Sequence, residues 1–411
     1  MSLINKYQQK TAGVVRYSCG ILFMLFTFCY LFFLQGEVLA EAQHIFSQGI
    51  TSYSPAIGAL IIPVVLMIVQ WIISLLSRLP NKAYSLSYAP SFLILAILAD
   101  IDSLYDGQVA FDKWLWIAPV FMVLYVILVI VVKKVDFTSD DTDYYYKSIL
   151  YPNYIILMFF ILCLGSVPRT KDIDLYELKT ERLIIDRDYA AAAEVGKKSL
   201  ATSKRLTQLR MYALSKQGLL AEQMFEYPQL YGSAGLLDIN DTTMRHRIHS
   251  SDICLHLGAF CGSTIKTPAR YLEIMISDSL WNKHTADYYL CSLLLDKKLS
   301  QFRRDLPRFY NLSDTIPNAY DALPKAYKEA LLAISDMDYA LQGKIVINGD
   351  SIAMLSDTTY ASDYKQYEAM KAGLSDLRER INKTHREYGH TYWWYFDFSE
   401  MGNGELSANK D

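Results

Sequence analysis

The stretch YSCGILFMLFTFCYLFFL, residues Tyr17–Leu34, contains 18 residues and no charge. At about 1.5 Å per residue in a helix, it nearly crosses a hydrocarbon layer about 30 Å thick. It is too long for the apolar core of a signal peptide, and no small-residue cleavage site follows it. We therefore expect a helix that stays in the membrane.

Four more apolar runs follow, and beyond them the 411-residue chain has the composition of a soluble protein. Together the runs predict five spans, at about 14–34, 56–76, 84–99, 114–132 and 148–167. The run at 84–99 is the shortest and contains Pro90, so it needs neighbouring helices to bury it. The predicted fold class is all-α, with a polytopic transmembrane helix bundle over residues 1–170 followed by a helical-repeat domain.

Lysine and arginine mark one side of the predicted bundle, as they do in the cytoplasmic loops of membrane proteins. The N-terminus and every second loop carry Lys6, Lys10, Arg16, Arg78, Lys82, Lys133, Lys134 and Lys147. The alternate loops carry Glu37, Glu41, Asp100, Asp102, Asp106 and Asp112. The pattern predicts a multi-pass protein of a bacterial inner membrane with a cytoplasmic N-terminus. Five spans put the domain after Val167 in the periplasm, whereas four spans would leave it in the cytoplasm.

Residues 171–388 show helical periodicity with almost no strand alternation. Predicted turns at Asp186–Asp188 and Lys216–Gly218 are spaced close to the period of about 34 residues of tetratricopeptide repeats. Ala221 and Phe225 match the small and large residues of the second helix of such a repeat, although ordinary helical packing gives similar spacing. We expect a tetratricopeptide-like domain, loops at 310–317 and 342–351, a last long helix at 361–386, and an aromatic segment with a flexible tail at 389–411.

Residues 37–48 predict a short polar-faced helix between the first two spans. Its apolar face holds Val38, Ala42, Ile45 and Phe46, and its polar face holds Glu37, Glu41, His44 and Gln48. Such a helix between two spans is typically interfacial, lying flat on the membrane surface. Glu41 and His44 also form the Glu-x-x-His pair of di-metal carboxylate sites, which makes them candidate metal ligands. The membrane half contains no second copy of this pair, so the interfacial helix is the preferred interpretation.

The acidic outer loops also permit an enzyme. Polytopic glycosyltransferases that use lipid-linked sugars place an acidic residue just after their first span, as general base or metal ligand. The candidate catalytic residues on this interpretation are Glu37, Glu41, His44, Asp100 and Asp102. Such enzymes usually have many more spans, and acidic outer loops follow from topology alone. A lipid-linked sugar or envelope-glycan transferase is therefore the alternative function.

Two further segments contain residue types that bind ligands. His246, His249, Cys254, His256 and Cys261 are potential zinc ligands, but their spacing fits no zinc pattern, and one helix would turn both cysteines toward a core. Together with Cys291, these cysteines could form at most one disulfide. The segment TYWWYFDF, residues 391–398, could bind sugars, but we expect it to pack against the domain or the bilayer.

Four segments carry a resemblance to a known family. They are QGEVLAEAQHIFSQGITSY (35–53), DYYLCSLLLDKKLSQFRRDLPRFY (287–310), LPKAYKEALL (323–332) and TYWWYF (391–396). The chain resembles a family of uncharacterised Bacteroidetes integral membrane proteins over most of its length, in the same order. The resemblance implies a membrane bundle followed by a helical domain, and it implies no activity and no site residues.

The remaining sequence signals exclude several functions. The chain contains no phosphate-binding loop, dinucleotide fingerprint, serine elbow or His-Glu-x-x-His motif, and its net charge of −3 without a basic run argues against nucleic-acid binding. We therefore expect a membrane-anchored scaffold or adaptor without cofactors. Its outer helical domain, next to the lipid bilayer, would bind envelope proteins or peptides.

Overall fold

The computed structural model describes residues 2–48, 50–51, 53–99, 102–103, 109–110, 112–134, 145–165, 172–239, 247–260, 267–312, 319–335, 337–348, 351–354 and 358–399. The chain divides into two compact units. The membrane unit comprises residues 1–178 and 243–247, and the helical unit comprises residues 179–242 and 248–411. Each unit is described by itself.

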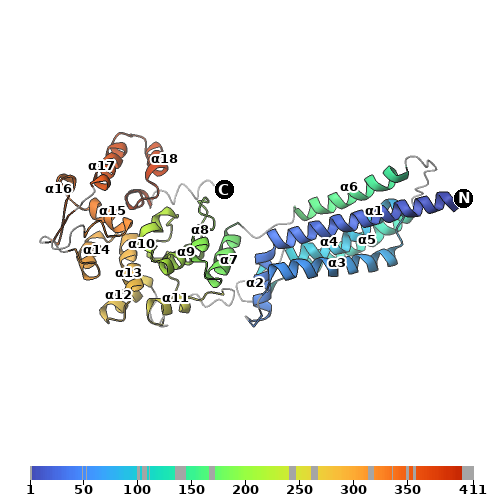
Figure 1. The fold of residues 1–411 in the computed structure, drawn as a ribbon, viewed down its shortest axis with the longest axis horizontal. Helices are drawn as coiled ribbons and strands as arrows, with labels where there is room; N and C mark the ends of the chain where they lie inside the picture. Colours follow the sequence, from blue (N-terminus) through green and yellow to red (C-terminus); the bar gives the residue numbers. More distant parts are fainter. Residues whose placement is uncertain are drawn as a thin grey trace. The chain divides into compact units, whose positions relative to one another are not determined.

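Five apolar segments of the membrane unit are long enough to cross a membrane, as the sequence predicted. They span residues 9–34, 55–77, 81–99, 113–134 and 146–165. Their helices are α1 (Ser2–Cys29), α3 (Pro55–Ser77), α4 (Ala89–Ala99), α5 (Asp112–Lys134) and α6 (Tyr145–Gly165), drawn in blue to green in Figure 1. A π-helix, η1 (Tyr30–Leu34), extends α1, and the short helix α2 (Gly36–Phe46) follows it.

The third span is made of two helices of different geometry. The 3₁₀ segment η2 (Asn81–Tyr88), which is kinked where Ala83 leaves helical geometry, precedes α4. The combined run has 19 residues, close to the roughly 20 that a helix needs to cross the hydrocarbon layer. Of its most apolar window, 61% of residues are buried, against 11–33% in the other spans. The prediction that neighbouring helices bury this weak span is therefore confirmed.

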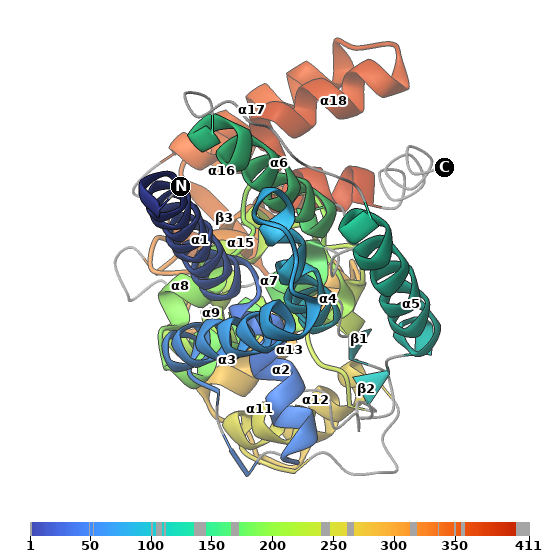
Figure 2. The same ribbon diagram turned by 90° about the vertical axis from the view of Figure 1, so that its right-hand side faces the viewer.

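Helix α1 packs against both α3 and α6, while α5 packs against α4 at the edge of the bundle (Figure 2). In the core, the Phe23 ring of α1 lies 4.9 Å from that of Tyr88 and 5.2 Å from that of Phe92, measured between ring centroids. Large apolar side chains also point outward, such as Ile68, Trp116 and Val123. An apolar outer surface is stabilised by lipid, which supports membrane association of this unit.

The helical unit is a succession of short helices, joined in sequence to the membrane unit through α7 (Asp172–Ile185). They are α8 (Tyr189–Glu194), α9 (Lys204–Gln217), α10 (Leu220–Gln223), α11 (Ser250–Leu257), α12 (Pro268–Ser277), α13 (Lys283–Leu295), α14 (Leu299–Asp305), α15 (Lys325–Ala333), α16 (Met337–Leu341), α17 (Thr359–Ala372) and α18 (Leu377–Tyr388). The 3₁₀ turns η3 (Met224–Glu226), η4 (Gly232–Gly235) and η5 (Leu306–Arg308) lie between them. The all-α fold predicted from the sequence is confirmed.

Five of these helices end in the same turn. Each has a residue with positive φ after its last turn: Arg187, Gly218, Gly258, Ser279 and Lys297. The next N–H donates to the carbonyl five residues earlier, over 2.8–3.3 Å, which is the Schellman arrangement. The turn reverses the chain after α7, α9 and α13 and so creates the predicted helix pairs. The second helices of these pairs have 6, 4 and 7 residues, and a regular tetratricopeptide repeat stays a prediction.

Two sequence expectations in this unit were wrong. Within the predicted loop at 342–351, β3 (Lys344–Ile347) begins an antiparallel hairpin with β4 (Ser351–Met354). The predicted last helix at 361–386 is broken into α17 and α18. Gly373 ends α17, and the Asp376 carboxylate caps α18 by accepting the N–H of Glu379 over 3.1 Å. This cap outweighs the helical periodicity on either side of it.

The core of the helical unit is rich in tyrosine. Tyr271, Tyr288, Tyr320 and Tyr327 are all at most 2% exposed. Several hydroxyls are satisfied inside the unit; that of Tyr320, for example, donates to the Lys328 carbonyl over 2.9 Å. Tyrosine combines apolar bulk with a polar tip, which suits a core built from short helices with many unpaired backbone ends.

Candidate functional sites

The first predicted site lies on α2, which packs against α3 and η1. The Glu41 side chain is buried at 4% exposure, and Glu37 and His44 are half-buried. Each of the three takes part in an interaction within the protein. Phe46, predicted on the apolar face, is 64% exposed. The helix is therefore more enclosed by protein than a helix lying flat on a bilayer, because its neighbours cover both faces.

The other half of the predicted carboxylate group is only partly described. Asp102 is the first residue of the short strand β1 (Asp102–Ser103), which pairs with β2 (Val109–Ala110), and Asp100 lies outside the described residues. Among the residues that the structure describes, no three His, Cys, Asp or Glu side chains gather in a way that could hold a metal ion. Glu37, Glu41 and His44 thus share the helix α2 but do not gather into a metal site.

The histidine and cysteine cluster is divided by the fold. Helix α11 ends at Leu257, where Gly258 takes the left-handed conformation, so the expected single helix through both cysteines is interrupted after Cys254. His246 and Cys261 lie outside the described residues. Cys254 is disulfide-bonded, and Cys291 is a buried free thiol. His249 precedes α11, and its N–H donates to the Asp252 carboxylate over 2.8 Å.

His256 meets two residues that the sequence analysis did not connect with it. Its Nε2 lies 3.0 Å from the Ser215 hydroxyl, and its ring centroid lies 4.3 Å from that of His284. A serine beside histidine suggests a nucleophile, but Ser215 lies in the interior of α9 and is 1% exposed. Desolvation, helped by the charge of Lys216, lowers the pKa of His256 to about 3. A general base needs a pKa near the working pH, so this cluster is structural.

A more open feature of the helical unit lies beside the aromatic segment. Two hollows of about 260 and 250 Å³ share the lining residues Gln229, Leu230, Tyr395 and Ser399 and are therefore neighbours. We call the two together the helical-unit groove. One wall is the chain from Phe225 to Leu230, and another is the helix of residues 392–399. The groove is large enough for several residues of an extended peptide.

Two hydrogen-bonding groups in the wall of this groove are unused. The Tyr227 hydroxyl and the Trp394 indole N–H are buried and have no hydrogen-bond partner among the described residues. Burial raises the pKa of Tyr227, so its hydroxyl keeps its proton and can donate. Two lysines flank the groove: Lys197 Nζ lies 5.7 Å from the Tyr227 ring centroid, and Lys297 Nζ lies 5.9 Å from that of Tyr395. Lys197 Nζ also forms ion pairs with Glu194 and Glu226 over 2.8 and 3.0 Å, and Glu226 and Asp296 lie in the same lining. The groove therefore offers hydrogen-bond donors, with its charges balanced.

The aromatic segment itself packs into the core, as expected. Tyr392, Trp393 and Tyr395 are at most 7% exposed. The buried Glu329 holds the segment: its carboxylate accepts the Tyr392 N–H over 2.6 Å, and its carbonyl accepts the Trp393 indole N–H over 2.8 Å. Burial raises the pKa of Glu329 to about 7. Glu329 could not be identified from the sequence, because nothing in the pattern of its amphipathic helix indicates contact with the distant aromatic segment.

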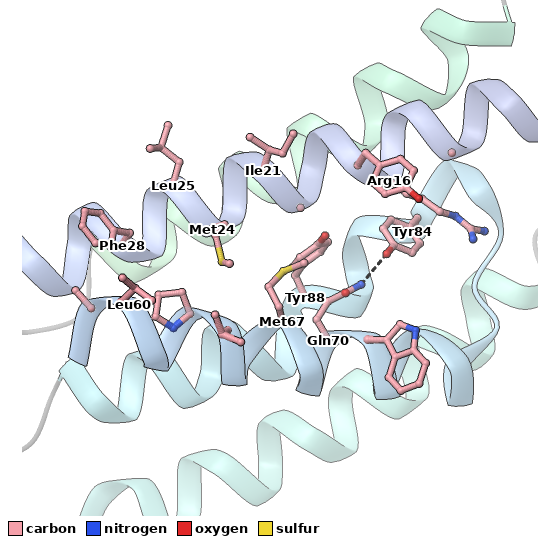
Figure 3. Close-up of a pocket in the computed structure, with 17 residues that line it drawn as sticks. Arg16, Ile21, Met24, Leu25, Phe28, Leu60, Met67, Gln70, Tyr84 and Tyr88 are labelled. Atoms are coloured by element: carbon pink, nitrogen blue, oxygen red, sulfur yellow. Dashed lines mark hydrogen bonds between the residues drawn. The ribbon is translucent and has the colours of Figure 1, made fainter. Parts of the chain in front are cut away.

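The membrane unit contains a second groove, of about 890 Å³, between α1 and α3 (Figure 3). We call it the bundle groove. Its walls are mostly apolar, with Met24, Phe28 and Leu60 toward one end, and its opposite end holds Arg16 and Tyr84. The sequence analysis used Arg16 only as a topology signal. The polar partners of Arg16 come from a segment some 65 residues away in sequence, which no local pattern reveals.

The fold and these grooves define a class: an all-α protein with five helices that could span a membrane and a helical unit of short, paired helices. A family model described as "Family of unknown function (DUF6057)" matches residues 105–264 and 260–399, more than half of the chain. The protein therefore belongs to this family. No curated protein and no solved structure matches the chain.

Proposed function

We propose that this protein is a membrane-anchored adaptor whose helical unit binds an extended segment of an envelope protein in the helical-unit groove. The observation that carries the proposal is Tyr227, a residue of the groove wall whose buried hydroxyl has no hydrogen-bond partner among the described residues. The Tyr227 side chain is 3% exposed. A buried polar group without a partner costs about 1–3 kcal/mol, and a ligand that supplies an acceptor removes that cost.

The groove chemistry favours a peptide. An extended peptide offers carbonyl oxygens at regular intervals along its length, which suits the separate donors Tyr227 and Trp394. The lining charges of Lys197 and Lys297 are matched by those of Glu226 and Asp296, so the groove does not select for a charged ligand. An extended segment that presents backbone carbonyls is the ligand with the best complementarity to these donors.

The proposal includes a location, the periplasmic side of a bacterial inner membrane. The lysine and arginine asymmetry of the loops supports a cytoplasmic N-terminus. The disulfide at Cys254 supports an oxidising compartment for the helical unit, because disulfides are rare in the cytosol. An oxidising compartment in turn agrees with five spans rather than four, since an odd number carries the chain across.

Site-specific photocrosslinking in cells tests the proposal. A photoreactive amino acid at Leu230, which lines both parts of the groove, should give discrete adducts with one or a few envelope proteins. The matched control is Leu255, an apolar residue of the same unit that is 50% exposed and lies outside the groove. Peptide-level mass spectrometry of the adduct would identify the bound segment, which we expect to be extended.

The variant Tyr227→Phe distinguishes specific binding from nonspecific crosslinking. Tyr227→Phe keeps the ring that Lys197 and Arg210 contact, at 5.7 and 5.2 Å from the ring centroid, and removes only the hydroxyl. Loss of about one hydrogen bond should reduce adduct yield severalfold to about tenfold. Equal adducts from Leu230 and Leu255, or no effect of Tyr227→Phe, would contradict the adaptor function.

A further inference from the structure

We propose that the bundle groove binds one anionic phospholipid, with an acyl chain along α1 and α3 and its phosphate at Arg16. This site lies in the membrane unit and is independent of the adaptor function. Two features carry the inference: the length and apolar lining of the groove, and the charge of Arg16 at its polar end, which has no carboxylate partner among the described residues.

The groove has the shape of an acyl chain. Along α1 its lining runs from Gly13 to Phe28, which is about 22 Å at the helical rise and exceeds half of a hydrocarbon core about 30 Å thick. Gly13 leaves the α1 wall open, since a Cβ added there would meet no atom within 4 Å. Gly20 instead lets α3 pack closely, because a Cβ added there would lie 3.3 Å from Met67 Cε. Because the two glycines are seven residues apart, they lie on the same helix face.

Contacts with η2 hold Arg16 in position at the polar end of the bundle groove. Arg16 Nη2 donates to Asn81 Oδ1 over 2.9 Å, and its guanidinium carbon lies 4.9 Å from the Tyr84 ring centroid. The Tyr84 hydroxyl in turn accepts from Gln70 Nε2 over 2.9 Å, the dashed line in Figure 3. Guanidinium has five N–H donors in a fixed plane, so one bond to Asn81 leaves an edge for a phosphate.

The charge of Arg16 favours an anionic headgroup. Arg16 has no carboxylate partner among the described residues, and it lies at the polar end of an otherwise apolar groove. A zwitterionic headgroup would bring its own cation next to the guanidinium, which lowers the net attraction.

Lipid quenching of Trp71, which lines the groove, tests the proposal on the full chain in nanodiscs. The probes are phosphatidylglycerol and phosphatidylcholine with identical mid-chain dibrominated acyl chains, each titrated into unbrominated phosphatidylcholine. Subtracting the signal of Trp71→Phe isolates this tryptophan. We expect brominated phosphatidylglycerol to reach half-quenching at about a tenfold lower mole fraction, since charged hydrogen bonds are strong.

Three variants sharpen the test. Arg16→Gln should abolish the difference between the two lipids. Arg78→Gln removes a cation at the end of α3, outside the groove lining, and should keep the difference. Gly13→Phe should also abolish it, by filling the open space next to an intact Arg16.

Three results would overturn the inference. One is equal quenching of the wild-type protein by the two lipids. Another is that Arg78→Gln abolishes the difference in quenching between the two lipids as completely as Arg16→Gln does. That result would show that the overall positive charge of this membrane face attracts the anionic lipid. The third is a Trp71 that neither lipid quenches while the protein crosslinks as a dimer through α1, which would show that a second copy covers the groove.

Discussion

Replacing Asn153 should destabilise the third span. This asparagine of α6 is fully buried, and it serves the 3₁₀ segment η2. Its Oδ1 accepts the Ser85 N–H over 2.7 Å, and its Nδ2 donates to the Asn81 carbonyl over 2.8 Å. Inside a membrane no water can replace these bonds, so irregular backbone is stable only where protein satisfies it.

The expected magnitude follows from the two backbone groups that lose their partner. Asn153→Leu keeps the side-chain volume approximately and removes both hydrogen bonds to η2. Each buried group left unsatisfied costs about 1–3 kcal/mol, so the free energy of unfolding of the membrane unit should fall by about 2–6 kcal/mol. At about 1.4 kcal/mol per factor of ten, opening of this region becomes at least about thirtyfold more frequent.

Alkylation of Cys19 measures this opening. Its sulfur is buried and lies 3.5 Å from the Ser85 hydroxyl, so a membrane-permeant maleimide reaches it only when η2 moves. Peptide-level mass spectrometry distinguishes Cys19 from the exposed thiols Cys29 and Cys163. The labelling rate of Cys19 in Asn153→Leu should rise by the same factor of at least about thirty.

The matched control is Thr27→Val. Thr27 is also fully buried in the membrane unit, but its hydroxyl has no hydrogen-bond partner among the described residues. Removing that hydroxyl should leave Cys19 labelling unchanged or slower. If Asn153→Leu behaves like Thr27→Val, the hydrogen bonds of Asn153 do not hold the third span, and the reasoning is refuted.

Three further predictions concern the helical unit. Desolvation raises the pKa of Glu329 from 4.5 to about 7. The contribution of Glu329 to stability is therefore complete below pH 4.5 and is lost as the pH rises through about 7. The difference in unfolding free energy between Glu329→Gln and wild type should change by about 3 kcal/mol between these limits, and a difference that does not vary with pH would contradict this. The pKa of His256 is lowered from 6.5 to about 3, so its contribution to stability is complete above pH 6.5 and is lost as the pH falls toward about 3. On acidification, the melting temperature of His256→Gln should fall less than that of the wild type. An equal fall in the two melting temperatures would contradict this. Alkylation without reduction should leave Cys254 unmodified in protein isolated from cells, and a modified Cys254 would argue against an oxidising compartment.

Local signals were sufficient for much of the fold. Hydropathy alone predicted the five spans, because crossing a hydrocarbon layer depends on the length and apolarity of one segment. The turns near Arg187 and Gly218 were also predictable, since a Schellman turn is formed by neighbouring residues. The break at Gly373 and Asp376 carried an equally local signal, a glycine followed by a cap, which the periodicity of the flanking helices obscured.

The grooves depended on tertiary structure. Tyr227 and Trp394 line the same groove although they are far apart in the sequence, and neither has a pattern that names the other. From the sequence, Arg16 indicates only which side of the membrane the N-terminus lies on. Its contacts with Asn81 and Tyr84 arise only from the packing of the helices. The predicted site on α2 shows the converse: its polar stripe is local, but its enclosure by neighbouring helices is not.

The sequence by itself determined which segments are apolar enough to enter a membrane, which form helices and where most of these end. Only the tertiary structure decided which polar groups find partners and which are left to line a groove. The physical reason is the distance along the sequence between the residues that interact. Helix formation and membrane insertion sum the properties of adjacent residues, whereas hydrogen-bond satisfaction and cavity shape depend on atoms that folding brings together from distant parts of the chain.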